Sequence, residues 1–146
     1  MQIISVINQK GGVGKTTSAI NLAAGLSQQN KKILVLDLDP QGNATTGLGL
    51  SNMDNSSETI YGVLNGTKEI IDVIKKTQFE NLDIITSNVD LSGLEVETAD
   101  DSNRAFLLKV KLTAYLNNSG GIYDYILIDC PPSLSLLTVM AFVSSN

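Results

Sequence analysis

Eight consecutive residues near the N-terminus have the types and the spacing that bind phosphate. They come shortly after the apolar run Ile3 to Ile7, and in order they are Lys10, Gly11, Gly12, Val13, Gly14, Lys15, Thr16 and Thr17. The glycines let successive backbone N–H groups face one anion, and the N-terminus of a following helix adds a partial positive charge. In such a loop Lys15 can reach the β- and γ-phosphates of a nucleotide, and the Thr16 hydroxyl can bind Mg²⁺. The alternative interpretation is a glycine-rich turn that only joins a strand to a helix.

Two carboxylates follow a second apolar run, Ile33 to Leu36. They are Asp37 and Asp39, and Pro40 comes directly after them. Ligands of open parallel sheets bind beyond the carboxyl ends of the strands, so this pair is expected beside the phosphate loop. Asp37 either orients a water of the metal or supports the loop. For Asp39 the alternative is a solvated turn residue before Pro40.

A third apolar run, Tyr125 to Ile128, also ends on a carboxylate, Asp129. Mg²⁺ keeps several waters and takes one or two protein oxygens together with the phosphates. Thr16 and Asp129 therefore suffice as the protein ligands of a magnesium site. The alternative is that Asp129 caps the next helix.

The elements that must position these residues alternate along the chain. The apolar runs predict strands buried on both faces, with a fourth strand at Leu82 to Thr86. Helices are expected at Thr16 to Gln29 (ending near Asn30), Glu58 to Leu64, Lys68 to Lys76 (capped by Thr67), Leu91 to Glu97, Arg104 to Leu116 and after Ser133, with a loop at Leu48 to Ser57. This order predicts an α/β fold, a mostly parallel sheet with helices on both faces.

The length and composition of the chain indicate one folded domain, residues 1–146. Its 42% hydrophobic and 17% charged residues suit a packed core. It has no histidine, and its one cysteine, Cys130, excludes a disulfide framework and is expected to be a small buried filler. Ten basic and 15 acidic residues give a net charge of −5, without a basic stripe for nucleic acid. Apolar runs are too short to cross a membrane, and a cytoplasmic location is expected.

The phosphate loop departs from the usual pattern G-x-x-x-x-G-K-[ST], because Gln9 stands at the first glycine and Lys10 follows it. This version resembles the deviant Walker A motif of the ParA/MinD family of dimeric ATPases, which have a P-loop NTPase fold. The resemblance implies that Lys10 reaches the nucleotide of the partner subunit and that Asp39 positions or activates the attacking water. It also implies that Pro40 to Gly47 form the mobile first switch and that Asp129 is the Walker B carboxylate.

Three further stretches resemble the chromosome- and plasmid-partitioning branch of that family. They are Asn43 to Gly49, Thr59 to Tyr61 and Ser87 to Leu91. This resemblance implies ATP and Mg²⁺ as cofactors, an ATP-dependent homodimer, a centromere-binding partner of the ParB type, nonspecific DNA as a further partner, and no membrane. The alternatives are an inactive remnant that binds a partner without ATP turnover, and a MinD-like septum-positioning ATPase.

Members of this family have about 250 residues or more, so we expect only the N-terminal portion of the fold. The later strands, the loop that holds adenine and the basic DNA-binding surface are expected to be missing. One edge of the first strand is then expected to be bare.

Overall fold

A mixed, mostly parallel sheet forms the centre of the molecule. The computed structural model describes residues 1–7, 14–53 and 55–146. The strands are β1 (Gln2–Val6), β2 (Ile33–Asp37), β3 (Ile74–Lys76), β4 (Leu82–Ile85) and β5 (Tyr125–Asp129). Their order in the sheet is β1-β5-β2-β4-β3, and β3 alone runs antiparallel to its neighbour. The predicted α/β class with a mostly parallel sheet is confirmed.

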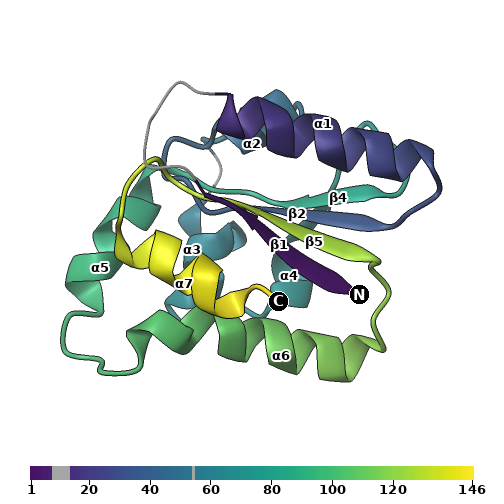
Figure 1. Cartoon of the computed structure of the whole chain (residues 1–146). Coiled ribbons are helices and arrows are strands. Elements are labelled where there is room, and N and C mark those ends of the chain that lie inside the picture. The colour runs from purple at the N-terminus through teal and green to yellow at the C-terminus, as the bar shows by residue number, and fades with distance from the viewer. Residues whose placement is uncertain (8–13, 54) are drawn as a thin grey trace.

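Helices cover both faces of this sheet (Figure 1). Helices α1 and α2 lie on one face, and α3, α4, α6 and α7 lie on the other. The helices are α1 (Lys15–Gln28), α2 (Asn43–Gly47), α3 (Ile60–Leu64), α4 (Ile70–Val73), α5 (Leu94–Glu97), α6 (Leu107–Ser119) and α7 (Leu136–Ser144). Short 3₁₀ turns lie at Ser56–Glu58, Val89–Gly93 and Arg104–Phe106.

Alternate residues of the central strands enter two separate cores. In β2, Leu34 and Leu36 pack among residues of α3, α6 and α7, whereas Ile33 and Val35 pack beneath α1 and α2. All four side chains are fully buried. This is why the run is apolar at every position: a strand covered on both faces has no solvent side.

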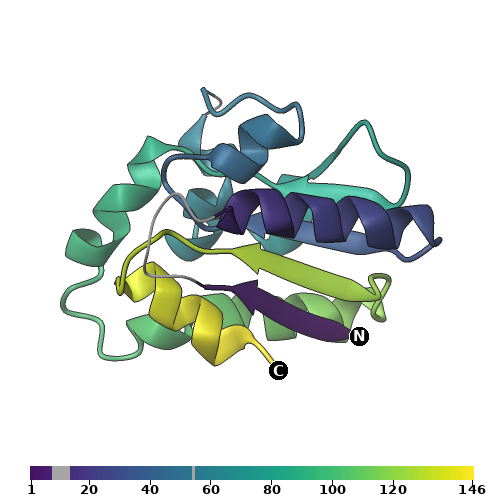
Figure 2. The ribbon, with the colours of Figure 1, turned by 45° about the horizontal axis from the view of Figure 1, so that its top comes forward.

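The register aligns the acidic strand ends. Asp37 of β2 pairs with Asp129 of β5, and Asp129 pairs with Val6 of β1. The carboxyl ends of these three strands therefore lie side by side at one end of the sheet, next to the start of α1 (Figure 2). The sequence places the candidate site at this carboxyl end.

The predicted helix Lys68 to Lys76 is wrong in its second half. Helix α4 ends at Val73, and the chain continues as β3, which pairs with β4. Thr67 does not cap this helix: its hydroxyl donates to Gly62, while Glu69 and Asp72 form a reciprocal capping box. Pairing with a strand distant in sequence overrides the local helical pattern.

Other boundaries differ less from expectation. Helix α1 ends at Gln28, one residue before the predicted Gln29, and Asn30 lies in the left-handed region at φ 61°. The predicted loop at Leu48 to Ser57 is confirmed for its described residues up to a 3₁₀ turn at Ser56–Glu58, and α3 begins at Ile60 rather than Glu58. Helix α2 was not predicted, and the helix expected at Leu91 to Glu97 is a 3₁₀ turn followed by the single turn α5.

β1 lies at one edge of the sheet, where β5 is its only strand neighbour among the described residues. We expected this edge of β1 to be bare, but Asn146 covers part of it. The Ile3 N–H donates to Asn146 Oδ1 at 2.8 Å, and the Asn146 N–H donates to the Ile3 carbonyl at 3.1 Å. Helix α7 runs beside the strand (Figure 2), and the Ser5 hydroxyl donates to the carbonyl of Ala141. In the parts of the chain that the structure describes, no helix is long and apolar enough to cross a bilayer.

Candidate functional site

The phosphate loop is described only at its end. Lys10, Gly11, Gly12 and Val13 lie outside the described residues, as does the side chain of Lys15. Gly14 has φ 81°, a left-handed conformation that glycine adopts at no steric cost. Helix α1 begins directly after it and runs for 14 residues. The first N–H groups of α1 have no partner within the helix, and this end of α1 stands where the sequence predicts an anion site.

Thr16 and Asp129 meet at this point. The Thr16 hydroxyl donates to Asp129 Oδ2 at 2.9 Å, although the two residues are 113 positions apart. Asp129 is fully buried. A hydroxyl and a carboxylate side by side are hard oxygen donors of the kind that Mg²⁺ prefers, so the pair fits the predicted metal site.

The alternative for Asp129 as a helix cap is wrong. Helix α7 begins at Leu136 after Ser135, seven positions beyond the aspartate, and no side chain caps it. Cys130, next along the chain, is fully buried and its thiol lies 3.9 Å from the carbonyl of Ile128. The expectation that this cysteine is a buried filler is confirmed.

Asp39 lies in the turn between β2 and α2. Its side-chain Oδ1 accepts the N–H of Gln41 at 3.0 Å, and its carbonyl accepts the N–H of Gly42 at 2.9 Å. Only 3% of the residue is exposed, so the alternative of a solvated turn residue is wrong. A buried carboxylate at the carboxyl edge of the sheet is suited to orienting a polar group of a ligand.

Asp37 supports the segment that follows it. Its Oδ1 accepts the N–H of Asp39 at 3.1 Å. Its Oδ2 accepts both the N–H and the hydroxyl of Thr45, at 2.8 and 2.7 Å. Of the two interpretations of Asp37 in the sequence, these bonds favour loop support.

Burial dominates the ionisation of Asp37. Removal from water disfavours the charged form and raises the pKa of this carboxyl to about 7. Hydrogen bonds from Thr45 and Asp39 act in the opposite direction, and the negative charge of Asp129 adds to the increase. The carboxyl end of the sheet thus holds three buried acidic side chains, and one of them, Asp129, contacts the first turn of α1 through Thr16.

Sequence reasoning missed Thr45. It is fully buried, and its hydroxyl also accepts the N–H of Ser87, just after β4, at 3.0 Å. The spacing of the buried residues Ala44, Thr45 and Leu48 is that of one helix face, which is the signal that could have identified an inward threonine.

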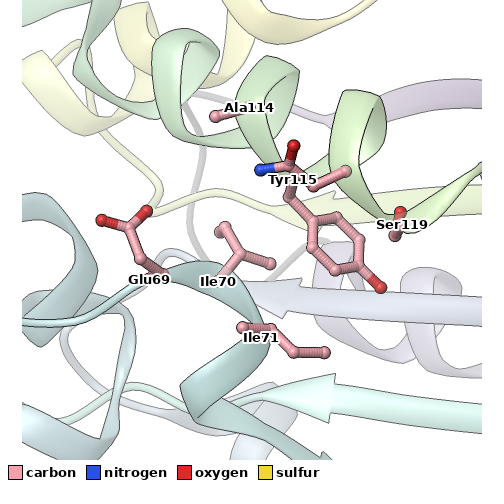
Figure 3. Close-up of a pocket in the computed structure, with 7 residues that line it drawn as sticks. Glu69, Ile70, Ile71, Ala114, Tyr115 and Ser119 are labelled. Atoms are coloured by element: carbon pink, nitrogen blue, oxygen red, sulfur yellow. The ribbon is translucent and has the colours of Figure 1, made fainter.

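A separate cavity lies between α4 and α6, on the face of the sheet opposite α1 (Figure 3). It has a volume of about 380 Å³ and a largely apolar lining that includes Ile70, Ile71 and Tyr115. None of the predicted site residues lines it.

A family described as an AAA domain matches residues 1–146, the whole chain. The chain belongs to this family. This chain is 47% identical over 145 residues to a curated relative, the sporulation initiation inhibitor protein Soj of Bacillus subtilis. It is 43% identical over 146 residues to the chromosome partitioning protein ParA of Caulobacter vibrioides. The alignments cover 99% and 100% of this chain but 55% and 54% of those proteins.

A solved structure shows the same fold. Cobyrinic acid a,c-diamide synthase from Mycobacterium smegmatis, with a bound ATP analog and magnesium, superposes with a TM-score of 0.90 at 34% identity. The match covers 99% of the AAA-domain chain and 57% of that structure. The predicted P-loop NTPase fold and the resemblance to ParA are confirmed, and the chain spans about half the length of the relatives it matches.

Proposed function

We propose that this chain is the N-terminal portion of a ParA-type partitioning ATPase that binds ATP with Mg²⁺. The observation that carries the proposal is the contact between the Thr16 hydroxyl and Asp129 Oδ2, 2.9 Å, at the start of α1. It joins a phosphate-binding segment to an acidic strand end, as a nucleotide-dependent metal site requires. The likeness to Soj and ParA proteins, at 47% and 43% identity, supports partitioning as the process.

The proposed roles follow the chemistry of phosphoryl transfer, in which positioning and electrostatics dominate. Thr16 and Asp129 would hold Mg²⁺, which when bound neutralises charge on the phosphates. The segment Lys10 to Thr17 binds the phosphates through its N–H groups, with Lys15 on the β- and γ-phosphates of the same subunit. Lys10 reaches the nucleotide of the partner subunit. Asp39 positions the attacking water.

The proposed assembly is a homodimer that forms with ATP and acts in the cytoplasm. A centromere-binding protein of the ParB type and nonspecific DNA are the proposed partners of the whole protein. The structure of the diamide synthase shares the fold at 34% identity, lower than that of the partitioning relatives. We therefore favour partitioning over a biosynthetic role.

The test of this proposal separates metal binding from nucleotide binding. Thr16→Val and Asp129→Asn remove the hydroxyl and the negative charge, with Thr113→Val, an exposed position on α6, as the matched control. ATP affinity is measured by calorimetry with Mg²⁺ and with EDTA. We expect the two site variants to lose most of the gain that Mg²⁺ gives, about tenfold or more in Kd, because losing even a group that holds a metal ion through its bound ligands or waters typically costs this much. If Mg²⁺ raises the ATP affinity of both variants as much as it raises that of wild type, the proposed metal site is refuted.

An inactive remnant is the outcome in which wild type binds MgATP but does not hydrolyse it. Phosphate release, measured with and without DNA and a ParB-type protein, distinguishes it from an active ATPase. Turnover that depends on Asp39 supports the ATPase, whereas binding without any turnover supports the remnant.

A further inference from the structure

The segment between β2 and β4 that carries Asp39 is held at two points by one carboxylate. Asp37 Oδ1 accepts the N–H of Asp39, at the start of the segment. Asp37 Oδ2 accepts the N–H and the hydroxyl of Thr45, in α2. The residues between these points, including Asp39, are thus closed into a loop whose ends share a fixed, buried anchor.

Thr45 connects this loop to a second strand end. Its hydroxyl donates to Asp37 Oδ2 at 2.7 Å and accepts the N–H of Ser87 at 3.0 Å. The hydroxyl of Ser87 takes no part, because its buried Oγ has no hydrogen-bond partner among the described residues. The connection therefore depends on the backbone of Ser87 and on the side chains of Thr45 and Asp37.

The backbone of the loop passes close to its neighbours at Gly42, where a side chain would not fit easily. Gly42 has φ 66°, and a Cβ added there would lie 3.3 Å from the carbonyl of Ser87 and 3.1 Å from Asn52. Asp37, Thr45 and Ser87 are each fully buried, so water does not compete for their hydrogen bonds. Buried, fully used hydrogen bonds of this kind fix one geometry.

We propose that Asp37 and Thr45 are positioning residues that fix Asp39 at the site and couple the loop carrying it to the end of β4. The proposal rests on the proposed function, because the role of Asp39 in turnover belongs to that function. It assigns to the first aspartate of the pair and to a buried threonine the task of holding the second aspartate. Neither residue touches the nucleotide in this scheme.

The test compares adjacent threonines of α2. Thr45→Val keeps the shape of the side chain and removes the hydroxyl that serves Asp37 and Ser87. Thr46→Val is the matched control, because Thr46 is exposed and, among the described residues, its hydroxyl bonds to the carbonyls of Gly42 and Asn43 within the same turn. Ser87→Ala is a second control, since the connection uses only the backbone N–H of Ser87. Thr45→Ser restores a hydroxyl.

The first readout is independent of ATP turnover. Amide hydrogen exchange without nucleotide reports local opening, and we expect Thr45→Val to speed exchange in residues 39–47 and 86–88 by about tenfold or more. Wild-type exchange is expected in Thr46→Val and Ser87→Ala, and exchange close to wild type in Thr45→Ser. Unchanged exchange in Thr45→Val would overturn the proposal, even if the chain proves to be no ATPase.

The second readout separates positioning from binding. Because misplacement of a catalytic group by a fraction of an ångström to one ångström costs on the order of tenfold to a hundredfold in rate, kcat should fall by that factor in Thr45→Val. The Kd for MgATP should stay within about twofold of wild type, and Thr45→Ser should recover kcat. Equal kcat values in Thr45→Val and Thr46→Val would contradict the positioning role. Absence of turnover in wild type would refute the proposed function and leave the exchange result as the decisive one.

Discussion

Single residues at the carboxyl edge of the sheet carry most of the chemistry. Thr16 is half-buried, Asp129 and Asp37 are fully buried, and Asp39 is 3% exposed. Burying three carboxyl side chains so close together is costly unless each has partners, and hydrogen bonds from Thr16, Thr45 and backbone N–H groups supply them. The arrangement raises the pKa of Asp37 in particular, because its burial outweighs its hydrogen bonds.

The pKa of Asp37 predicts how stability changes with pH in the absence of nucleotide and Mg²⁺. Between about pH 4 and pH 7 the folded chain keeps a proton on Asp37 that the unfolded chain has lost. The free energy of unfolding should therefore decrease as pH rises through this range, by at most about 1.4 kcal/mol per pH unit from this group. Above about pH 7 the contribution of Asp37 levels off.

Urea unfolding at a series of pH values measures this decrease. Asp37→Asn should flatten it, whereas Asp100→Asn, at an exposed position in a turn, should keep the wild-type decrease. An identical pH profile in wild type and Asp37→Asn would show that the buried carboxyl does not titrate in this range.

The two lysines of the phosphate loop should have different roles. Lys15→Ala should abolish nucleotide binding, because the proposed role of this lysine is to neutralise the phosphates of its own subunit. Lys10→Ala should keep binding and lose ATP-dependent dimerisation. Calorimetry and light scattering measure the two properties, and equal loss of both in the two variants would refute this division.

At the scale of elements, the strands were more predictable than the segments between them. Three strands were identified because each is a short apolar run that must be covered on both faces, and the fourth, β4, because Ile84 and Ile85 follow Leu82. β3 was missed because Ile70, Ile71, Val73 and Ile74 have helical spacing, and because its three residues are too few to show alternation. Its pairing with β4 is a tertiary event that the local sequence does not contain.

The sequence predicted that Thr16 and Asp129 come together, but not the bonds that hold the segment carrying Asp39. The motif pattern identified Thr16, Asp39 and Asp129, because each stands at a fixed offset from a strand or a glycine loop. The bond from Asp37 to Thr45 depends on how α2 folds back over the end of β2, and α2 itself was not predicted. The structure leaves Lys10 to Val13 and the side chain of Lys15 as predictions.

A polar cluster at the opposite end of the sheet ties three strands together. The Tyr123 hydroxyl donates to Asp83 Oδ2 at 2.6 Å, and Lys76 Nζ lies 3.1 Å from the same oxygen. Tyr123 precedes β5, Asp83 is in β4 and Lys76 is in β3. Burial and the adjacent Asp83 raise the pKa of Tyr123, so its hydroxyl remains a donor at neutral pH.

Removing this hydroxyl should destabilise the fold. Tyr123→Phe leaves a buried carboxylate with one partner fewer, which typically costs about 1–3 kcal/mol. Tyr61→Phe is the matched control: its hydroxyl also bonds to a carboxylate, Glu97 at 2.6 Å, but at an exposed position where the loss should be well under about 1 kcal/mol. Equal shifts of the urea midpoint would contradict a structural role for the Tyr123–Asp83 pair.

At the scale of the whole molecule, the carboxyl end of the sheet gathers the described residues that the proposed metal site uses. Helix α1 starts there, β2 and β5 end there, and the loop carrying Asp39 folds back over it (Figures 1 and 2). Two helical layers exclude water from the strands, which keeps the carboxylates fixed and desolvated. The chain matches about half the length of Soj and ParA, so dimerisation, DNA binding and partner binding are proposals for the whole protein.

Two calorimetric titrations of the wild-type chain with ATP, one in the presence of Mg²⁺ and one in the presence of EDTA, test the central claim most directly. We predict one ATP bound per chain and an affinity that Mg²⁺ raises by about tenfold or more, since the ion would join the phosphates to Thr16 and Asp129. An ATP affinity that is the same with Mg²⁺ and with EDTA, or no binding at all, would contradict it.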